Sequence, residues 1–148
     1  MSDHAPTEGR PVSQEGSGSI PGLRRQGGAP TDTVVVLSTA PDVLLAKRIA
    51  HLLVEESLVA CAQVGPLVTS MYLWQGQLEG TEESPLCLKT TAAQLPALYA
   101  RLYELHPYEI PEFLVLGVAA GSTAYLDWVA ESARESTPGR PDVQSSLE

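Results

Sequence analysis

The order of apolar and polar residues predicts alternating strands and helices through the middle of the chain. Residues 33–40, TVVVLSTA, form a short β-branched run that is typical of a buried strand. Over residues 45–53 the apolar residues recur at helical spacing, and Pro41 and Asp42 before them suit the first turn of a helix. We expect this first helix to run to about Leu58.

A long hairpin and a second helix are expected next. Residues 60–91 indicate two strands around Gln75-Gly76, which suit a two-residue turn. A stripe of leucines over residues 95–105 then predicts a helix, in which Pro96 is tolerated because it falls in the first turn.

The last elements complete an α+β fold. Residues 113–120, FLVLGVAA, predict another buried strand, and Gly121-Ser122-Thr123 suits the start and cap of a third helix. The order β-α-β-β-α-β-α is that of the split βαβ, or ferredoxin-like, arrangement with one added helix. We therefore expect an antiparallel sheet with helices on one face.

The hairpin is too long for the domain that carries it. Two arms of about 15 residues would span roughly 50 Å, whereas a domain of this size is only about 34 Å across. With a turn at Gln75-Gly76, Pro66 stands opposite Pro85, and neither residue donates a ladder hydrogen bond. We expect a long, bent hairpin with a break at this level.

The outer part of the hairpin is apolar on both sides. Met71 and Leu73 point to one face of the hairpin, and Tyr72 and Trp74 point to the other. Because this would leave an apolar patch in water, we expect the outer hairpin to pack against another copy of the chain. The alternative is that it folds back on its own sheet.

Composition sets the domain limits and excludes some partners. Residues 1–31 and 135–148 are rich in glycine, proline and serine without any hydrophobic period, so we expect disordered tails around one domain over residues 32–134. The formal net charge is −9, and no basic cluster exists beyond Arg24-Arg25, which argues against nucleic acid or anionic lipid as partners. No run is long and apolar enough for a membrane span or a signal peptide, which predicts a soluble cytoplasmic protein.

Five stretches together carry a resemblance to a known family. They are VVVLSTAPD, VACAQVGPLVTSMYLWQGQLE, CLKTT, HPYEIPEFLVLGV and GSTAYLDWV. In order and spacing they resemble the CutA divalent-cation-tolerance family. The resemblance implies a ferredoxin-like subunit in a tight homotrimer whose strand extensions join neighbouring sheets. It also implies binding or tolerance of divalent cations, copper in particular, and a eukaryotic branch linked to membrane anchoring of acetylcholinesterase.

The corner segment, ELHPYEIPE at residues 104–112, is the candidate metal site. Bacterial members that this chain resembles often carry a cysteine at the position of Ser38 and two adjacent histidines at the positions of Leu105 and His106. One imidazole per subunit is a poor ligand set for copper. We therefore predict weak binding of copper or another divalent cation, chiefly through His106. The possible further ligands are Ser38, Glu109 and Glu112.

The same segment also fits a purely structural corner. Pro107 disfavours helical geometry at His106, so the second helix would end there, and Pro111 keeps Ile110 extended. His51, on the polar face of the first helix, is expected to be solvated.

The two cysteines do not indicate a zinc site. Cys61 and Cys87 lack the CxxC and Cys-x-His spacings of such sites, so we expect them to pack as small hydrophobic residues in reduced form. They are the next suspects if copper binding does not depend on His106.

No feature of the sequence predicts an enzyme. Acylphosphatases share the fold but need an arginine after the first strand, and STAPD supplies none. Neither G-x-G-x-x-G nor a Walker loop occurs. A regulatory trimer of the PII type, which binds small ligands between subunits, is the other alternative, although its nucleotide-binding loop is not recognisable.

Overall fold

The computed structural model describes residues 20–134. Residues 1–19 of the tail expected over residues 1–31, and the whole tail expected over residues 135–148, lie outside this range. Three α-helices and seven strands follow one another in the described chain. They are β1 (Leu23–Arg25), β2 (Thr33–Ala40), α1 (Val43–Glu55), β3 (Cys61–Val64), β4 (Val68–Trp74), β5 (Gln77–Thr91), the 3₁₀ turn η1 (Ala92–Gln94), α2 (Leu95–Leu105), β6 (Leu114–Gly117), β7 (Ala120–Ser122) and α3 (Thr123–Ser132).

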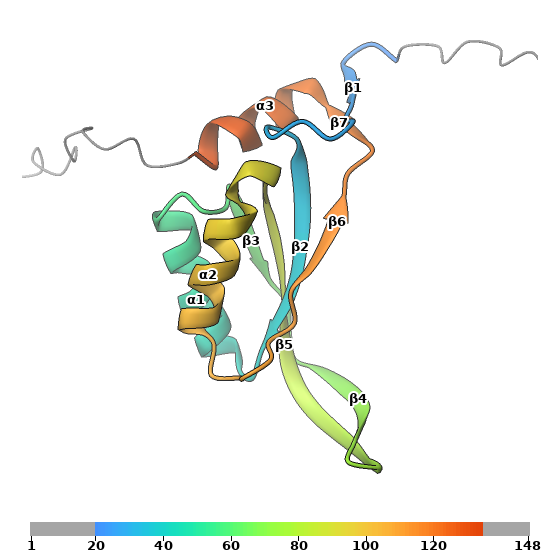
Figure 1. The fold of residues 1–148 in the computed structure, drawn as a ribbon, viewed down its shortest axis with the longest axis vertical. Coiled ribbons are helices and arrows are strands. Elements are labelled where there is room, and N and C mark those ends of the chain that lie inside the picture. The colour runs from blue at the N-terminus through green and yellow to red at the C-terminus, as the bar shows by residue number, and fades with distance from the viewer. Residues whose placement is uncertain (1–19, 135–148) are drawn as a thin grey trace, which may run out of the picture.

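The main sheet is antiparallel, with strand order β3-β5-β2-β6. Strand β4 pairs only with the outer half of β5, and β1 pairs with β7 in a separate two-stranded sheet. Helices α1 and α2 lie side by side on one face of the main sheet, while α3 lies across its far end (Figure 1). The predicted α+β class with antiparallel sheets and three helices is confirmed.

The core lies between the sheet and the two helices α1 and α2. Alternate residues of β2 and β5 point into it, because side chains on a strand alternate between the two faces. It is closed by leucines of α2 and by the apolar stripe of α1. Its fully buried members include Val36, Leu86, Leu88, Ile49, Leu53, Leu98 and Leu102.

The helix ends follow local rules. Ser122 caps α3, as predicted. Asp42, expected in the first turn of α1, lies just before it and caps it by accepting the Leu45 N–H at 2.7 Å. Helix α1 ends at Glu55 rather than near Leu58, so that prediction is wrong by about one turn. Ser57 takes a φ of 59°, a left-handed conformation that stops the helix.

Residues 20–31 do not form the structureless tail that their composition predicts. Strand β1 pairs with β7, and the side-chain amide of Gln26 exchanges two hydrogen bonds with the backbone of Thr33 and donates a third to Val118 O. Asp32 accepts three consecutive backbone N–H bonds from residues 27–29. The prediction fails here because hydrogen bonds of β1, Gln26 and Asp32 order this segment, although it has no hydrophobic pattern.

The hairpin turns where the sequence predicts and projects from the body (Figure 1). Gln75 and Gly76 both have positive φ, at 50° and 77°, and Trp74 pairs with Gln77. The ladder is interrupted between β3 and β4, and its register shifts by one residue there. A Cβ on Gly65 would lie 2.6 Å from Pro85 Cγ, so a larger residue at position 65 would force the chain at Gly65 and at Pro85 to move apart.

Candidate functional site

The corner segment is held to the end of β2 through the ring of His106, which is 7% exposed. His106 closes α2 with extended backbone, at φ −90° and ψ 134°, as the following proline predicts. Its Nδ1 accepts the Tyr108 N–H at 3.1 Å, so the proton sits on Nε2, which donates to Thr39 O at 2.7 Å. Both ring nitrogens of the neutral imidazole are thus already engaged.

The other predicted ligands do not gather around this ring. Ser38 is buried and donates its hydroxyl hydrogen to Glu112 O at 2.7 Å, which fastens the far end of the corner segment to β2. The Glu109 and Glu112 residues are exposed. Within residues 20–134, no group of three or more His, Cys, Asp or Glu side chains is placed to hold a metal ion.

A buried carboxylate beside this corner is absent from the sequence-based prediction. Glu83 is 9% exposed and accepts the Thr39 hydroxyl at 2.7 Å. Burial, assisted by the charge of Glu83 and by Tyr72, raises the pKa of Tyr108 above its ordinary value. No sequence signal singles out Glu83 from the other glutamates near it, since its burial depends on the hairpin register.

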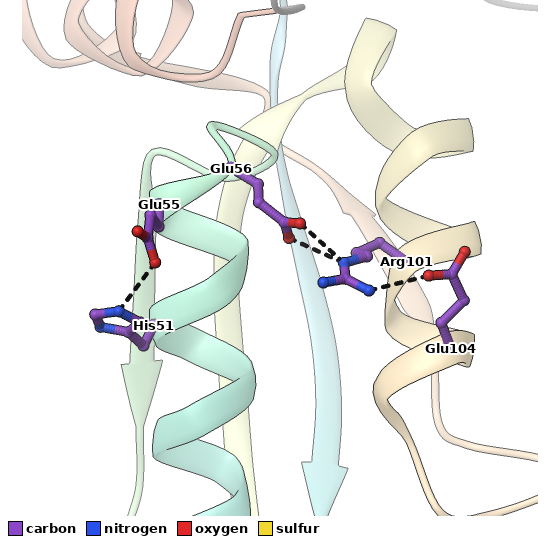
Figure 2. Close-up of polar contacts among 5 residues, drawn as sticks. All are labelled: His51, Glu55, Glu56, Arg101 and Glu104. Atoms are coloured by element: carbon purple, nitrogen blue, oxygen red, sulfur yellow. Dashed lines mark hydrogen bonds and ion pairs between the residues drawn. The ribbon is translucent and has the colours of Figure 1, made fainter. Parts of the chain in front are cut away.

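The polar faces of α1 and α2 carry only surface ion pairs (Figure 2). His51 Nε2 lies 3.0 Å from Glu55 Oε2, and both side chains are largely exposed, as predicted for a solvated histidine. Arg101 bridges Glu56 and Glu104, each at 3.0 Å, and these carboxylates raise its pKa. Exposed pairs of this kind contribute about 0–1 kcal/mol, so they do not define a site.

A cluster of two thiols and a lysine, which are more reactive groups, lies on the sheet face opposite α1 and α2. Cys61 stands across the ladder from Lys89, and Cys87 precedes Lys89 by two residues on β5. The Lys89 ammonium lies 5.5 Å from the centre of the Tyr125 ring of α3. The neighbouring Tyr125 side chain raises the pKa of Lys89, and the two thiols add to this effect. The period-2 spacing of Cys87 and Lys89 is the signal that predicts their common face.

The distal hairpin, residues 68–83, carries the largest concentration of exposed apolar side chains. Leu73 is 72% exposed and Trp74 is 60% exposed, and the hairpin projects away from the body sheet (Figure 1). The alternative in which the hairpin folds back on its own sheet is therefore wrong. The buried strand predicted over residues 113–120 is wrong: the strand β6 there spans only Leu114–Gly117, lies at the sheet edge beside β2, and is exposed. Its exposed residues are Leu114, Val115 and Leu116.

These features define an α+β domain with a projecting apolar hairpin and a corner segment that is hydrogen-bonded to β2 through His106 and Ser38. The family model described as CutA1 divalent ion tolerance protein matches residues 34–132. The chain therefore belongs to the CutA1 family. No helix within the described part of the chain is long and apolar enough to cross a membrane.

Named relatives and solved structures agree with this family. The divalent-cation tolerance protein CutA of Escherichia coli O45:K1 is 46% identical over 104 residues, covering 70% of this chain and 93% of that protein. A structure from Thermus thermophilus, described as divalent cation tolerance protein (Cut A1), has a TM-score of 0.67 at 43% identity and covers 69% and 99% of the two chains. A structure from Archaeoglobus fulgidus, described as a periplasmic divalent cation tolerance protein CutA, has a TM-score of 0.66 at 26% identity, covering 69% and 99%.

Proposed function

We propose that this chain is a non-enzymatic, homotrimeric protein of divalent-cation tolerance, with weak binding of copper or a similar ion. Family membership supports the tolerance role. The strand order β3-β5-β2-β6 supports a ferredoxin-like, split βαβ subunit. We place the protein in the cytoplasm on its sequence, although the Archaeoglobus fulgidus relative is described as periplasmic.

The observation that carries the assembly is the distal hairpin. Its apolar side chains face water on both sides in a single subunit, and soluble monomers rarely expose contiguous apolar patches of this kind. The β6 edge exposes unpaired backbone groups beside apolar side chains, which favours pairing with another strand. A closed ring of copies covers such a surface in every subunit, whereas an open chain of copies leaves the last one uncovered.

Weak metal binding follows from the bonding of the corner segment. A metal ion on His106 Nε2 would displace the bond to Thr39 O, and one on Nδ1 would displace the bond from Tyr108 N–H. The lost hydrogen bonds reduce the free energy gained from the metal. We therefore propose His106 as the principal ligand of a weak site, with Ser38, Glu109 and Glu112 as secondary candidates.

A calorimetric titration with Cu²⁺ tests this site. The wild type is expected to bind weakly, His106→Ala to abolish the binding, and the double change Ser38→Cys with Leu105→His to strengthen it by adding a thiol and a second imidazole. Tight binding by the wild type that survives His106→Ala would reject the proposal, because the ligands would then lie elsewhere.

A second candidate, a PII-like trimer that binds small ligands, is favoured by one observation. A hollow of about 280 Å³ on the open sheet face is lined by Thr39, Gln63, Cys87 and Glu112 among others. Thermal unfolding in the presence of nucleotides and of metal salts separates the two functions. A rise in Tm with a nucleotide but with no metal would favour the PII-like candidate.

A further inference from the structure

Two thiols and a lysine share one face of the main sheet. Cys61 on β3 and Cys87 on β5 are diagonal neighbours, since their ladder partners are Lys89 and Gln63. Leu86 and Leu88, which flank Cys87, are buried in the core under α1 and α2, so Cys87 and Lys89 point to the opposite face. Both thiols are free and half-buried.

The spacing of these thiols suits a shared metal ion better than a disulfide. Diagonal neighbours on antiparallel strands have Cα atoms about 7–8 Å apart, whereas a disulfide needs about 4.4–6.8 Å. Two sulfurs on opposite sides of one ion are about 4.6 Å apart, twice a metal–sulfur distance of about 2.3 Å. Cysteine side chains that lean toward each other across a ladder reach this separation without backbone movement.

The number of ligands selects the class of ion. A structural zinc site needs four ligands, and the described residues 20–134 hold no cluster of three or more His, Cys, Asp and Glu side chains. Thiolates favour soft ions such as Cu(I), which accepts two ligands. We propose that Cys61 and Cys87 bind one Cu(I) ion as a dithiolate, with Lys89 as its counter-charge.

The binding step balances without any redox partner. Each thiol releases one proton to solvent, two copper–sulfur bonds form, and the ion stays Cu(I) throughout. The resulting Cu(SR)₂ group carries one negative charge, and the Lys89 ammonium stands across the ladder from Cys61 and two residues from Cys87. Cys87 also lines the hollow of about 280 Å³, so the ion can approach Cys87 from solvent on this side.

This site is separate from the His106 corner. A role of this Cu(I) site in copper tolerance rests on the proposed function, but Cu(I) binding by the two cysteines does not depend on it. The test uses the reduced full-length protein under anaerobic conditions, with Cu(I) supplied in competition with bicinchoninate as a coloured chelator. The expected result is one Cu(I) per chain. Cys61→Ser and Cys87→Ser should each lower the affinity by at least about 100-fold, since one thiolate is half of the ligand set.

The contribution of the lysine is measured with a matched pair of variants. Lys89→Met should lower the Cu(I) affinity by about 10-fold, because an outer group that stabilises the ligands is lost. Lys47→Met removes the same charge from an exposed position on α1 and should leave the affinity unchanged. Equal effects of the two variants would reject the role of Lys89.

A second readout needs no substitution, which protects the test against variants that fail to fold. One equivalent of Cu(I) should protect both cysteines of the wild type from iodoacetamide, as seen by peptide mass. Absence of Cu(I) uptake, alkylation of either cysteine in the loaded protein, or uptake that survives both serine variants would overturn the site. None of these outcomes touches the proposed trimer. The Cu²⁺ titration at His106 is repeated in the Cys61→Ser, Cys87→Ser background, in which these two thiols cannot contribute, so the two failures are distinguishable.

Discussion

Leu88 and Leu73 lie on neighbouring parts of the same hairpin and meet opposite surroundings. Leu88, on β5 in the body, is fully buried among α1 and α2, whereas Leu73, on β4 in the distal hairpin, is 72% exposed. The body thus completes its own core, but the distal hairpin has nothing of its own to pack against. The difference teaches that the apolar pattern of the body serves folding, whereas that of the distal hairpin is left over from folding and is what we propose for association.

Truncation at these two leucines should separate folding from assembly. Leu88→Ala removes fully buried atoms and leaves a cavity, so it should lower the free energy of unfolding by about 2–5 kcal/mol. Leu73→Ala should change the unfolding of the subunit by less than about 0.5 kcal/mol and weaken association instead. Urea titrations and light scattering on both variants check this, and equal losses of subunit stability would contradict the comparison.

His106→Ala tests whether the corner belongs with the body. It removes the ring that bonds Thr39 O and Tyr108 N–H, so it should cost about 2–3 kcal/mol in the free energy of unfolding, measured in urea at neutral pH. His51→Ala is the matched control, because His51 makes only an exposed ion pair and should cost about 0–1 kcal/mol. If His106→Ala lowers the free energy of unfolding no more than His51→Ala does, the His106 hydrogen bonds do not stabilise the fold.

Gly65→Ala tests the boundary between the body and the distal hairpin. The new Cβ would lie 2.6 Å from Pro85 Cγ, so the strands must separate locally at a cost of about 1–3 kcal/mol. Gly27→Ala is the control, since nothing lies within 4 Å of its Cβ position. If thermal unfolding shows equal losses of Tm for the two variants, Gly65 and Pro85 do not pack closely in solution.

The hairpin turn should show the smallest effect, and in the opposite direction. Gln75 holds a φ of 50°, which a residue with a Cβ adopts reluctantly. Gln75→Asn should therefore raise the free energy of unfolding by several tenths of a kcal/mol, because asparagine tolerates this conformation in two-residue turns. A decrease measured in urea would mean that the Gln75 side chain contributes more than its backbone costs.

Local chemistry made much of the fold predictable from the sequence. Asp42 and Ser122 cap helices through their own side chains, Pro107 ends α2, and Gln75-Gly76 closes the hairpin. Each of these features depends on residues within four positions of one another. The pattern therefore contains all the information that such a feature needs.

Features that depend on distant partners were not predictable in the same way. The pairing of β1 with β7 joins residues almost a hundred positions apart, and no apolar period marks β1. The ring of His106 meets Thr39 O, which is 67 positions away, so its engagement could not be read from the corner segment alone. The sequence predicts that the corner segment is stiff and has few ligands for copper. The hydrogen bonds that support this prediction are seen only in the folded structure.

The central claim is that the exposed distal hairpin exists to join copies of this chain. Light scattering of the full-length protein at low micromolar concentration measures this most directly. We predict a mass three times that of the 15.8 kDa chain, and a smaller mass for Trp74→Ala, whose side chain is 60% exposed in the single subunit. A monomeric mass for the wild type under native conditions would contradict the account.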